Sequence, residues 1–305
     1  MTISIICPHK DAEPWLAALR DVDPSLDVQV WPNENNKADV ELETPRGCVK
    51  RLPQPALHLL HGRRYRPHAQ RRYLPQHLPV IRQVDPMLAQ SMFEYTLTAV
   101  MHYFREFDAY QNQQRQTQWQ PQPPKSMGQT TIGIMGLGQL GQYSAEKFSN
   151  MGFKVAGWSR SKKTIEGVDT YAGEHQLEPF LAQTDILICL LPLTDQTRNI
   201  LNTELFNALP QGACLVNVAR GEHLVEQDLI DALNAGQLRG ACLDVFQQEP
   251  LPKQHPFWQH PQVLLTPHCS SITDPRSVAP QIVENYRLMK SGGVLLNQVD
   301  IKRGY

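Results

Sequence analysis

From about residue 130 onward, short apolar runs alternate with amphipathic helical stretches, and no hairpin-turn sequence separates them. The strand-like runs are TTIGIMG, FKVAGWS, DILICLLP, ACLVNVAR, GACLDVF and VLLTPH. Helical spacing is found in GQLGQYSAEKFSNMG, EHQLEPFLAQT and EQDLIDALNAG. Continuous apolar strands that alternate with helices predict a doubly wound α/β fold with a parallel sheet. An antiparallel α+β domain, the alternative, would need hairpin turns here.

The chain has 305 residues, which is too long for one typical core and predicts two domains. Near the N-terminus, TISIIC, AEPWLAALRDV and DVQVW predict a strand, a helix and a strand of a second, smaller α/β unit. Residues 91–118 predict one long helix, followed by a Pro-rich linker. The tail from about residue 282 follows another long helix, and we expect it to return to the smaller unit.

Composition excludes several classes of protein. The apolar share of 41% and the charged share of 19% are typical of a globular protein. A net charge of -1 gives no reason to expect nucleic acid or an anionic membrane as partner, and no run approaches the roughly 20 apolar residues of a membrane span. No CxxC pair or other metal motif is present, so no metal is expected. Six scattered cysteines, several of them inside apolar strand-like runs, predict reduced, buried thiols in a cytoplasmic protein: Cys7, Cys48, Cys189, Cys214, Cys242 and Cys269.

The sequence G-L-G-Q-L-G, with Gly136, Gly138 and Gly141, follows a predicted strand and opens a predicted helix. The first glycine permits a tight turn, the second lets the backbone approach a pyrophosphate, and the third lets helix and strand pack closely. The N–H groups of Gln139 and Leu140 and the helix dipole then favour phosphate. In this context the motif predicts dinucleotide binding, the alternative being a Gly-rich turn without a ligand.

The end of the next strand indicates which dinucleotide is bound. Enzymes that use NAD usually place an acid there for the ribose 2′-OH, but this chain has Ser159, Arg160, Ser161, Lys162 and Lys163. A hydroxyl and three cations suit a 2′-phosphate. NADP(H) is therefore predicted, with NAD(H) less favoured, unless this is an ordinary basic surface loop.

Three further segments, NVARGE, LDVFQQEPLP and LTPHCSS, bring polar residues to the carboxyl ends of predicted parallel strands. This is the edge where doubly wound sheets bind ligands. Arg220 can hold a carboxylate, His268 can move a proton, and Glu249 can tune the imidazole. Each alone has a plain structural interpretation, as a solvated charge, a satisfied histidine or a loop residue. Behind a nucleotide motif, the three together predict a catalytic site.

These motifs, with HLPVIRQVDP, FEYTLTAVMHYFREFDAYQ, PFWQHPQVLLTPH and the terminal QVDIKRGY, resemble the D-isomer-specific 2-hydroxyacid dehydrogenases, most closely the glyoxylate/hydroxypyruvate reductase A group. The resemblance covers residues 74–305 closely and residues 1–43 loosely. It implies a Rossmann-type NADP domain at residues 91–281 and a flavodoxin-like substrate domain at residues 1–90 with 282–305. It also implies a homodimer.

The resemblance further implies hydride transfer between the nicotinamide C4 and C2 of a short 2-keto acid. His268 would give a proton to the forming hydroxyl, Glu249 would hold the imidazole and favour its protonated form, and Arg220 would bind the substrate. Asp244 would contact the nicotinamide carboxamide. The cofactor-binding set that it implies is Gly136, Gly138, Gln139, Leu140, Gly141, Ser159, Arg160, Lys162, Pro192, Val218, Ala219 and Asp244. No role follows for Cys189, His223, Glu226 or Cys269.

Residues 57–75, LHLLHGRRYRPHAQRRYLP, stand where the family has a substrate-carboxylate loop of the pattern G-A-G-[VI]-D. Residues 44–84 contain no Asp or Glu, although 30 in 305 predicts about four. We hypothesise that residues 49–73 are translated out of frame. Permitted codons for Leu52 to Arg72, read one nucleotide later, can encode FPNLRCISSMGAGIDHMLKDV, which restores a GAGID loop. The rival interpretation is a basic arm that binds RNA or an acidic partner.

Two functional hypotheses follow. In the first, the chain is an active NADPH-dependent glyoxylate/hydroxypyruvate reductase. In the second, it binds NADPH but is catalytically impaired, because residues 57–66 lack the anion-binding loop.

Overall fold

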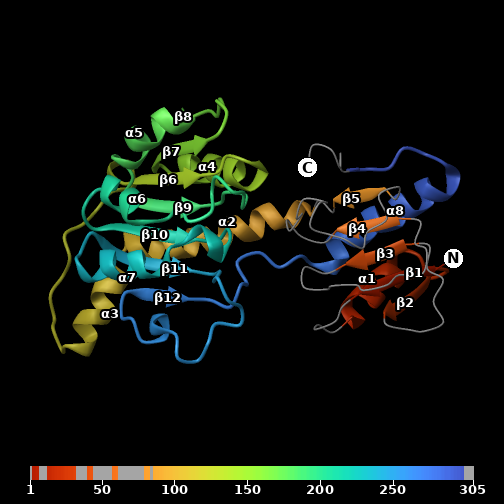
Figure 1. Cartoon of the computed structure of the whole chain (residues 1–305), viewed down its shortest axis with the longest axis horizontal. Coiled ribbons are helices and arrows are strands. Elements are labelled where there is room, and N and C mark those ends of the chain that lie inside the picture. The colour runs from red at the N-terminus through yellow and green to blue at the C-terminus, as the bar shows by residue number, and fades with distance from the viewer. Residues whose placement is uncertain are drawn as a thin grey trace. The chain divides into compact units, whose positions relative to one another are not determined.

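The computed structural model describes residues 2–6, 12–31, 40–43, 57–60, 79–82 and 85–298. The chain forms two compact units, residues 1–87 with 273–305, and residues 88–272 (Figure 1). The boundaries expected from the sequence, after residues 90 and 281, fall slightly later in the chain. The second of them falls inside helix α8, which belongs as a whole to the smaller unit.

The larger unit is built on seven strands in the order β12-β11-β10-β9-β6-β7-β8, and each neighbouring pair is parallel. This confirms the predicted doubly wound fold. The strands are β6 Thr131–Met135, β7 Lys154–Ser159, β8 Asp169–Ala172, β9 Ile186–Cys189, β10 Ala213–Asn217, β11 Leu238–Leu243 and β12 Val263–Leu265. Strand β8 was not predicted, because this edge strand is only partly buried and its sequence, DTYA, has no apolar run.

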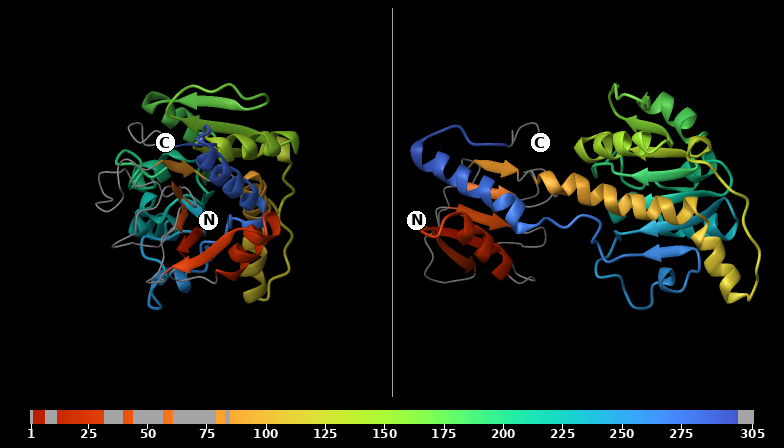
Figure 2. Two further views of the ribbon diagram at one scale, coloured as in Figure 1. Left: turned by 90° about the vertical axis from the view of Figure 1, so that its right-hand side faces the viewer. Right: turned by 180° about the vertical axis from the view of Figure 1, so that it is seen from behind.

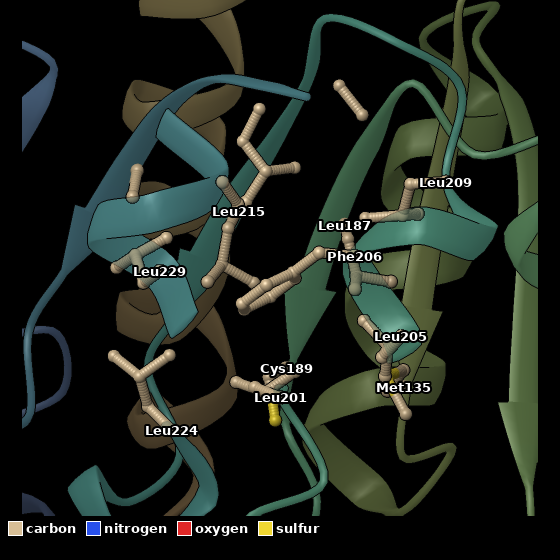
Figure 3. Close-up of a cluster of buried hydrophobic side chains, with 14 of the residues drawn as sticks. Met135, Leu187, Cys189, Leu201, Leu205, Phe206, Leu209, Leu215, Leu224 and Leu229 are labelled. Atoms are coloured by element: carbon tan, nitrogen blue, oxygen red, sulfur yellow. The ribbon is translucent and has the colours of Figure 1, made fainter. Parts of the chain in front are cut away.

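Helices cover both faces of this sheet. One face packs against α2 Pro86–Phe104 and α4 Gln139–Asn150, and Figure 2 shows α2 crossing the strands. The other packs against α5 Leu177–Leu181, α6 Thr203–Ala208 and α7 Glu226–Asn234 (Figure 3). Successive strand residues face opposite ways, so Leu215 joins the second cluster and Val216 the first. Every residue of β10 is therefore buried, which explains its continuous apolar sequence.

Short 3-10 turns complete the larger unit, at Met127–Gln129, Glu174–Gln176, Gly221–His223 and Pro256–Trp258. The predicted helix EHQLEPFLAQT is thus split into a 3-10 turn and the short α5. Helix α4 ends at Asn150, and two residues later Gly152, whose φ of 95° lies in the left-handed region, turns the chain away from the helix axis.

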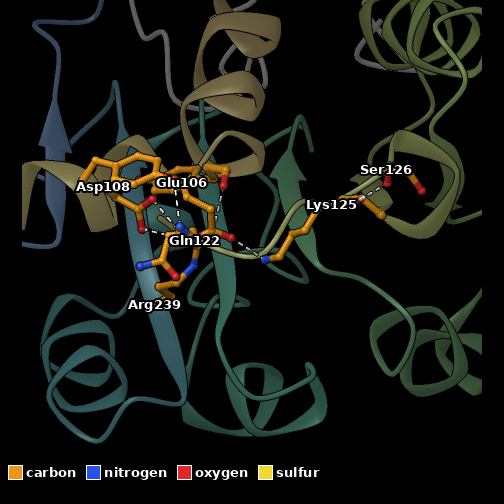
Figure 4. A network of polar contacts seen from close by, with 9 residues as sticks. Glu106, Asp108, Gln122, Lys125, Ser126 and Arg239 are labelled. Carbon is orange, nitrogen blue, oxygen red and sulfur yellow. Dashed lines mark hydrogen bonds and ion pairs between the residues drawn. The ribbon is translucent and has the colours of Figure 1, made fainter. Parts of the chain in front are cut away.

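The prediction of a single helix over residues 91–118 is wrong. Helix α2 ends at Phe104, and α3, Phe107–Arg115, begins after Glu106, whose φ is 60°. Tertiary ion pairs explain the break: the Glu106 carboxylate pairs with Arg239 and Lys125, each at 2.5 Å, while Arg239 also donates to the carbonyl of Tyr103 (Figure 4). Long-range pairing of this kind outweighs local helix propensity and is invisible to sequence periodicity.

The smaller unit has a parallel sheet in the order β2-β1-β3-β4-β5. This is the strand order of flavodoxin-like folds, the kind of domain that the family resemblance implies. Its strands are β1 Thr2–Ile6, β2 Asp27–Trp31, β3 Val40–Glu43, β4 Leu57–Leu60 and β5 Val80–Arg82. Helices α1 Glu13–Val22 and α8 Pro275–Ser291 share its core through Trp15, Leu19, Ile282 and Tyr286.

Only β4 represents the basic stretch in this structure. It pairs with β3 on one side and with the edge strand β5 on the other. The remaining residues of the 49–73 segment, and with them most of the frameshift hypothesis, lie outside the described residues. Within the described ranges, no helix is long and apolar enough to cross a bilayer.

Candidate functional site

The residues predicted to form the site lie at the carboxyl edge of the large sheet, because parallel strands all end on the same side. In strand order, the edge carries His268 after β12, Asp244 and Glu249 after β11, Val218, Ala219 and Arg220 after β10, Pro192 after β9, Gly136 to Gly141 after β6, and Ser159, Arg160 and Lys162 after β7. The strand order reverses between β6 and β9, which is where such sheets bind dinucleotides.

The glycine motif joins β6 to the start of α4. Gly136 has a φ of 107°, and a Cβ on Gly141 would lie 1.9 Å from the carbonyl oxygen of Gly136. These two positions therefore need glycine for the turn and for helix–strand packing. Gly138 is the N-cap residue of α4, and a Cβ there would have no described atom within 4 Å. Its open side leaves the backbone accessible at the positive end of the helix dipole.

The end of β7 is basic and open to solvent. Arg160 and Lys162 are exposed, whereas Ser159 is partly buried and donates its hydroxyl to the carbonyl of Ser161 at 2.8 Å. No acid occupies the positions from 159 to 163. Both cations are therefore accessible to a phosphate at this end of the site.

His268 and Glu249 form a direct pair at the other end of the edge. The imidazole Nδ1 lies 2.8 Å from Glu249 Oε2 and 3.0 Å from Oε1, and Glu249 Oε1 also accepts from the amide of Phe246 at 3.2 Å. A carboxylate can only accept, so Nδ1 carries the proton of this bond. With the His268 side chain 29% exposed and Glu249 12% exposed, this is the geometry of an acid/base group held by a carboxylate.

Asp244 is fully buried and holds the segment that carries His268. Its Oδ1 accepts from the hydroxyl of Thr266 at 2.6 Å and from the amide of Cys269 at 2.8 Å. Its Oδ2 accepts from the amide of Ser270 at 2.9 Å. The contact of Asp244 with the nicotinamide carboxamide stays a prediction, but its bonds to this segment are in place.

Arg220 is partly buried, and its backbone is anchored by two residues whose roles the sequence did not reveal. Its Nη1 donates to the carbonyl of Ala219 at 2.5 Å. Its own carbonyl lies 3.2 Å from Asn217 Nδ2 and 3.1 Å from His223 Nδ1. Both neighbours are fully buried, and burial lowers the pKa of His223. Polar residues in such buried positions are expected to be hydrogen-bonded, which is the signal that could have identified them.

The described cysteines do not favour nucleophilic chemistry. Burial raises the pKa of the Cys189 and Cys214 thiols to about 12 and that of Cys242 to about 11. The expectation of buried thiols is wrong for Cys269, which is exposed because it follows strand β12 instead of lying within a buried strand. Desolvation nevertheless raises the pKa of its thiol as well. In the part of the chain that the structure describes, no three potential metal ligands gather.

A family model for the NAD-binding domain of D-isomer specific 2-hydroxyacid dehydrogenases matches residues 97–270, which contain the whole of this edge. The chain belongs to this family. The family resemblance drawn from the motifs is thereby confirmed.

Relatives within the 2-hydroxyacid dehydrogenases match over the full chain. A glyoxylate/hydroxypyruvate reductase A from Serratia proteamaculans is 42% identical over 317 residues, with 100% of both chains covered. A family member from Xanthobacter autotrophicus Py2, solved with NADPH, has a TM-score of 0.90 at 37% identity, with 100% of this chain and 99% of that chain covered. An NADPH-dependent glyoxylate/hydroxypyruvate reductase from Sinorhizobium meliloti, solved with NADP and sulfate, has a TM-score of 0.88 at 32% identity, with 100% of both chains covered.

Proposed function

We propose that this chain is an NADPH-dependent reductase of glyoxylate and hydroxypyruvate, which it converts to glycolate and D-glycerate. The observation that carries the proposal is the His268–Glu249 pair at 2.8 Å on the same sheet edge as the glycine motif. The reductases from Serratia and Sinorhizobium, which match the full chain, support the substrate class.

The residues at the edge fit NADPH. The start of α4, with Gly136, Gly138 and Gly141, presents backbone N–H groups to the pyrophosphate, and Gln139 and Leu140 lie in its first turn. Ser159, Arg160 and Lys162 lie where the 2′-phosphate of the same cofactor would reach β7. Pro192, Val218, Ala219 and Asp244 lie further along the edge, on the side of His268, and would hold the nicotinamide half. When bound, the cofactor supplies a hydride to C2 of the keto acid.

The protein supplies the binding and proton-transfer groups. Arg220 holds the keto and carboxylate oxygens of the substrate through its guanidinium. His268 gives a proton to the keto oxygen as C2 is reduced, so that this oxygen becomes the neutral hydroxyl of the product. Glu249 fixes the ring through Nδ1, which orients the other nitrogen, Nε2, as the proton-donating atom.

The alternative is a chain that binds NADPH without efficient turnover. The substrate-carboxylate loop of the family is missing from residues 57–66, and loss of such an anion-binding loop can cost about 10³-fold or more in rate. NADPH titration by fluorescence, beside turnover assays with glyoxylate and with hydroxypyruvate, separates the two. Turnover of the purified chain supports the reductase, whereas tight NADPH binding without turnover establishes the impaired binder.

The frameshift hypothesis has its own test. Resequencing the DNA across codons 40 to 80 from an independent isolate should reveal a base missing near codon 49 and one regained near codon 73. That result would restore the family loop. The same sequence found again would assign the basic stretch to the natural protein and favour the impaired binder.

The expected partners are a small keto acid and a second copy of the chain, with neither nucleic acid nor membrane, and the expected location is the cytoplasm. Two exposed aromatic side chains lie at and just after α3: Phe107, its first residue, is 56% exposed, and Trp119, in the coil that follows the helix, is fully exposed. We propose that this region forms a homodimer interface. Analytical ultracentrifugation should give a dimer mass, and Trp119→Gln should weaken the dimer. A monomer at micromolar concentration would contradict the interface.

A further inference from the structure

A chain of hydrogen bonds links helix α2 to the buried carboxylate of Asp244. The hydroxyl of Tyr95, on α2, lies 2.5 Å from Thr266 Oγ1, and Thr266 donates to Asp244 Oδ1 at 2.6 Å. The Tyr95 oxygen also lies 3.4 Å from the thiol of Cys242 on β11. Three elements that are distant in the sequence therefore meet at one row of polar groups inside the larger unit.

The donor and acceptor roles along this row of hydrogen bonds are fixed by the carboxylate at its end. A carboxylate has no proton, so Thr266 uses its single hydroxyl proton toward Asp244, and Tyr95 must donate to Thr266. The Tyr95 oxygen then accepts from Cys242. Burial raises the pKa of Tyr95 and raises the pKa of Cys242 to about 11, so both groups keep their protons at neutral pH. Aligned hydrogen bonds of this kind strengthen one another.

The carboxylate at the end of the chain holds the backbone beyond His268. Asp244 accepts from the amides of Cys269 and Ser270 at 2.8 and 2.9 Å. His268 itself has a φ of 55°, a left-handed backbone conformation that residues other than glycine adopt uncommonly. Such a conformation persists only where neighbouring contacts hold it. The hydrogen bonds from the amides of Cys269 and Ser270 lie immediately after His268 and supply that restraint.

A second contact joins α2 to the same segment. The hydroxyl of Ser271 donates to the carbonyl of Leu88, near the start of α2, at 3.1 Å. Helix α2 is therefore tied to residues 266–271 at two points, one of which leads through Tyr95 to Asp244.

We propose that Tyr95 is a positioning residue for proton transfer: its hydroxyl, through Thr266, fixes Asp244, and Asp244 fixes the backbone that aims His268. The proposal rests on the proposed reductase function for its catalytic consequence. Its structural part concerns the amides of Cys269 and Ser270 and can be measured on the full chain without turnover.

The test compares Tyr95→Phe with Tyr143→Phe, which removes a hydroxyl that also contacts α2, at Gln90, but has no link to Asp244 in the described structure. Hydrogen–deuterium exchange of the peptide spanning residues 266–271 is measured on each full-length variant. We expect exchange at Cys269 and Ser270 to be about tenfold faster in Tyr95→Phe, the effect of about one hydrogen bond, and unchanged in Tyr143→Phe. Turnover of Tyr95→Phe should show kcat lowered about tenfold, with KM for NADPH within about twofold.

Thr266 provides a rescue control. Thr266→Ser keeps the hydroxyl and should match the wild type, whereas Thr266→Val should match Tyr95→Phe, and combining Thr266→Val with Tyr95→Phe should add little. Wild-type exchange in Tyr95→Phe, equal effects in the two tyrosine variants, or faster exchange with unchanged kcat would each overturn the proposal. A wild-type chain without turnover counts against the reductase function alone, and amide exchange then decides whether Tyr95 holds the segment.

Discussion

Strand β11 carries charged groups at both of its ends. At the amino end, Arg239 pairs with Glu106 at 2.5 Å and with Asp108 at 3.0 Å, and it donates to the carbonyl of Tyr103 (Figure 4). Just beyond the carboxyl end, Asp244 binds no cation among the described residues but accepts from a hydroxyl and two backbone amides. One cluster balances charge within itself, and the other fixes the backbone around His268.

The difference shows that a shifted pKa does not by itself mark the catalytic edge. Burial raises the pKa of Asp108 and of Tyr103 and lowers the pKa of His102, and all three lie around the amino-edge cluster. This cluster has a structural role, because its two acids, Glu106 and Asp108, are little exposed and are paired with Arg239 and Lys125. At the carboxyl edge, the accessible His268 is held in place by its hydrogen bond to Glu249 and by the backbone that Asp244 fixes, as a reacting group requires.

Replacing an arginine by methionine at each of the two edges should separate their roles most clearly. Arg220→Met should lower kcat/KM for glyoxylate by about 10³-fold, because the substrate carboxylate loses its charged partner. Arg239→Met should leave kcat/KM of the folded enzyme within about twofold. Steady-state kinetics, with NADPH affinity from fluorescence as a control on folding, measures both. Equal losses in the two variants would remove the functional distinction between the edges.

Stability should respond in the opposite sense. Arg239→Met leaves Glu106 and Asp108, which are 12% and 16% exposed, without their shared partner. Its free energy of unfolding should fall by about 2–4 kcal/mol. Lys125, 51% exposed, contributes less, so Lys125→Met should cost under about 1 kcal/mol. Urea unfolding measures each value, and similar losses for the two variants would show that the cluster is not built around Arg239.

Cofactor choice tests the far end of the carboxyl edge. Arg160→Gln removes a charge-assisted contact to the 2′-phosphate, so KM for NADPH should rise about tenfold or more while KM for NADH changes little. Parallel assays with the two cofactors provide the comparison. An equal rise for both would place the 2′-phosphate elsewhere.

The smallest expected effect is a pH dependence of stability. Burial lowers the pKa of His223 below its ordinary value of 6.5. The neutral His223 side chain therefore makes its full contribution to the free energy of unfolding above pH 6.5. This contribution is lost as the pH falls through 6.5 toward the lowered pKa, because the unfolded chain binds the proton first. His223→Gln should reduce the loss of unfolding free energy between about pH 7.5 and about pH 5.5. Because burial also lowers the pKa of His102 and His260, a smaller dependence should remain. An unchanged slope would contradict this assignment.

The elements that could be predicted from the sequence are those marked by a repeating apolar pattern or by residues that the backbone conformation requires. Buried strands such as β10 reveal themselves as apolar runs, and the glycine motif marks the start of α4. The break at Glu106 depends on Arg239, more than 100 residues later, and no periodicity carries that information. The role of Tyr95 was missed for the same reason, since its partners Thr266 and Cys242 are defined only by the packing of α2 on the sheet.

Proton transfer from His268 is tested by single-turnover oxidation of NADPH by glyoxylate, with the wild type beside His268→Gln. We expect turnover by the wild type and a rate slower by about 10²–10⁴-fold in His268→Gln, with NADPH affinity unchanged. Glu249→Gln, which keeps the shape of the side chain but loses the charge at Nδ1, should lie between the two. Equal rates for the wild type and His268→Gln would contradict the assignment of this sheet edge as the site of proton transfer.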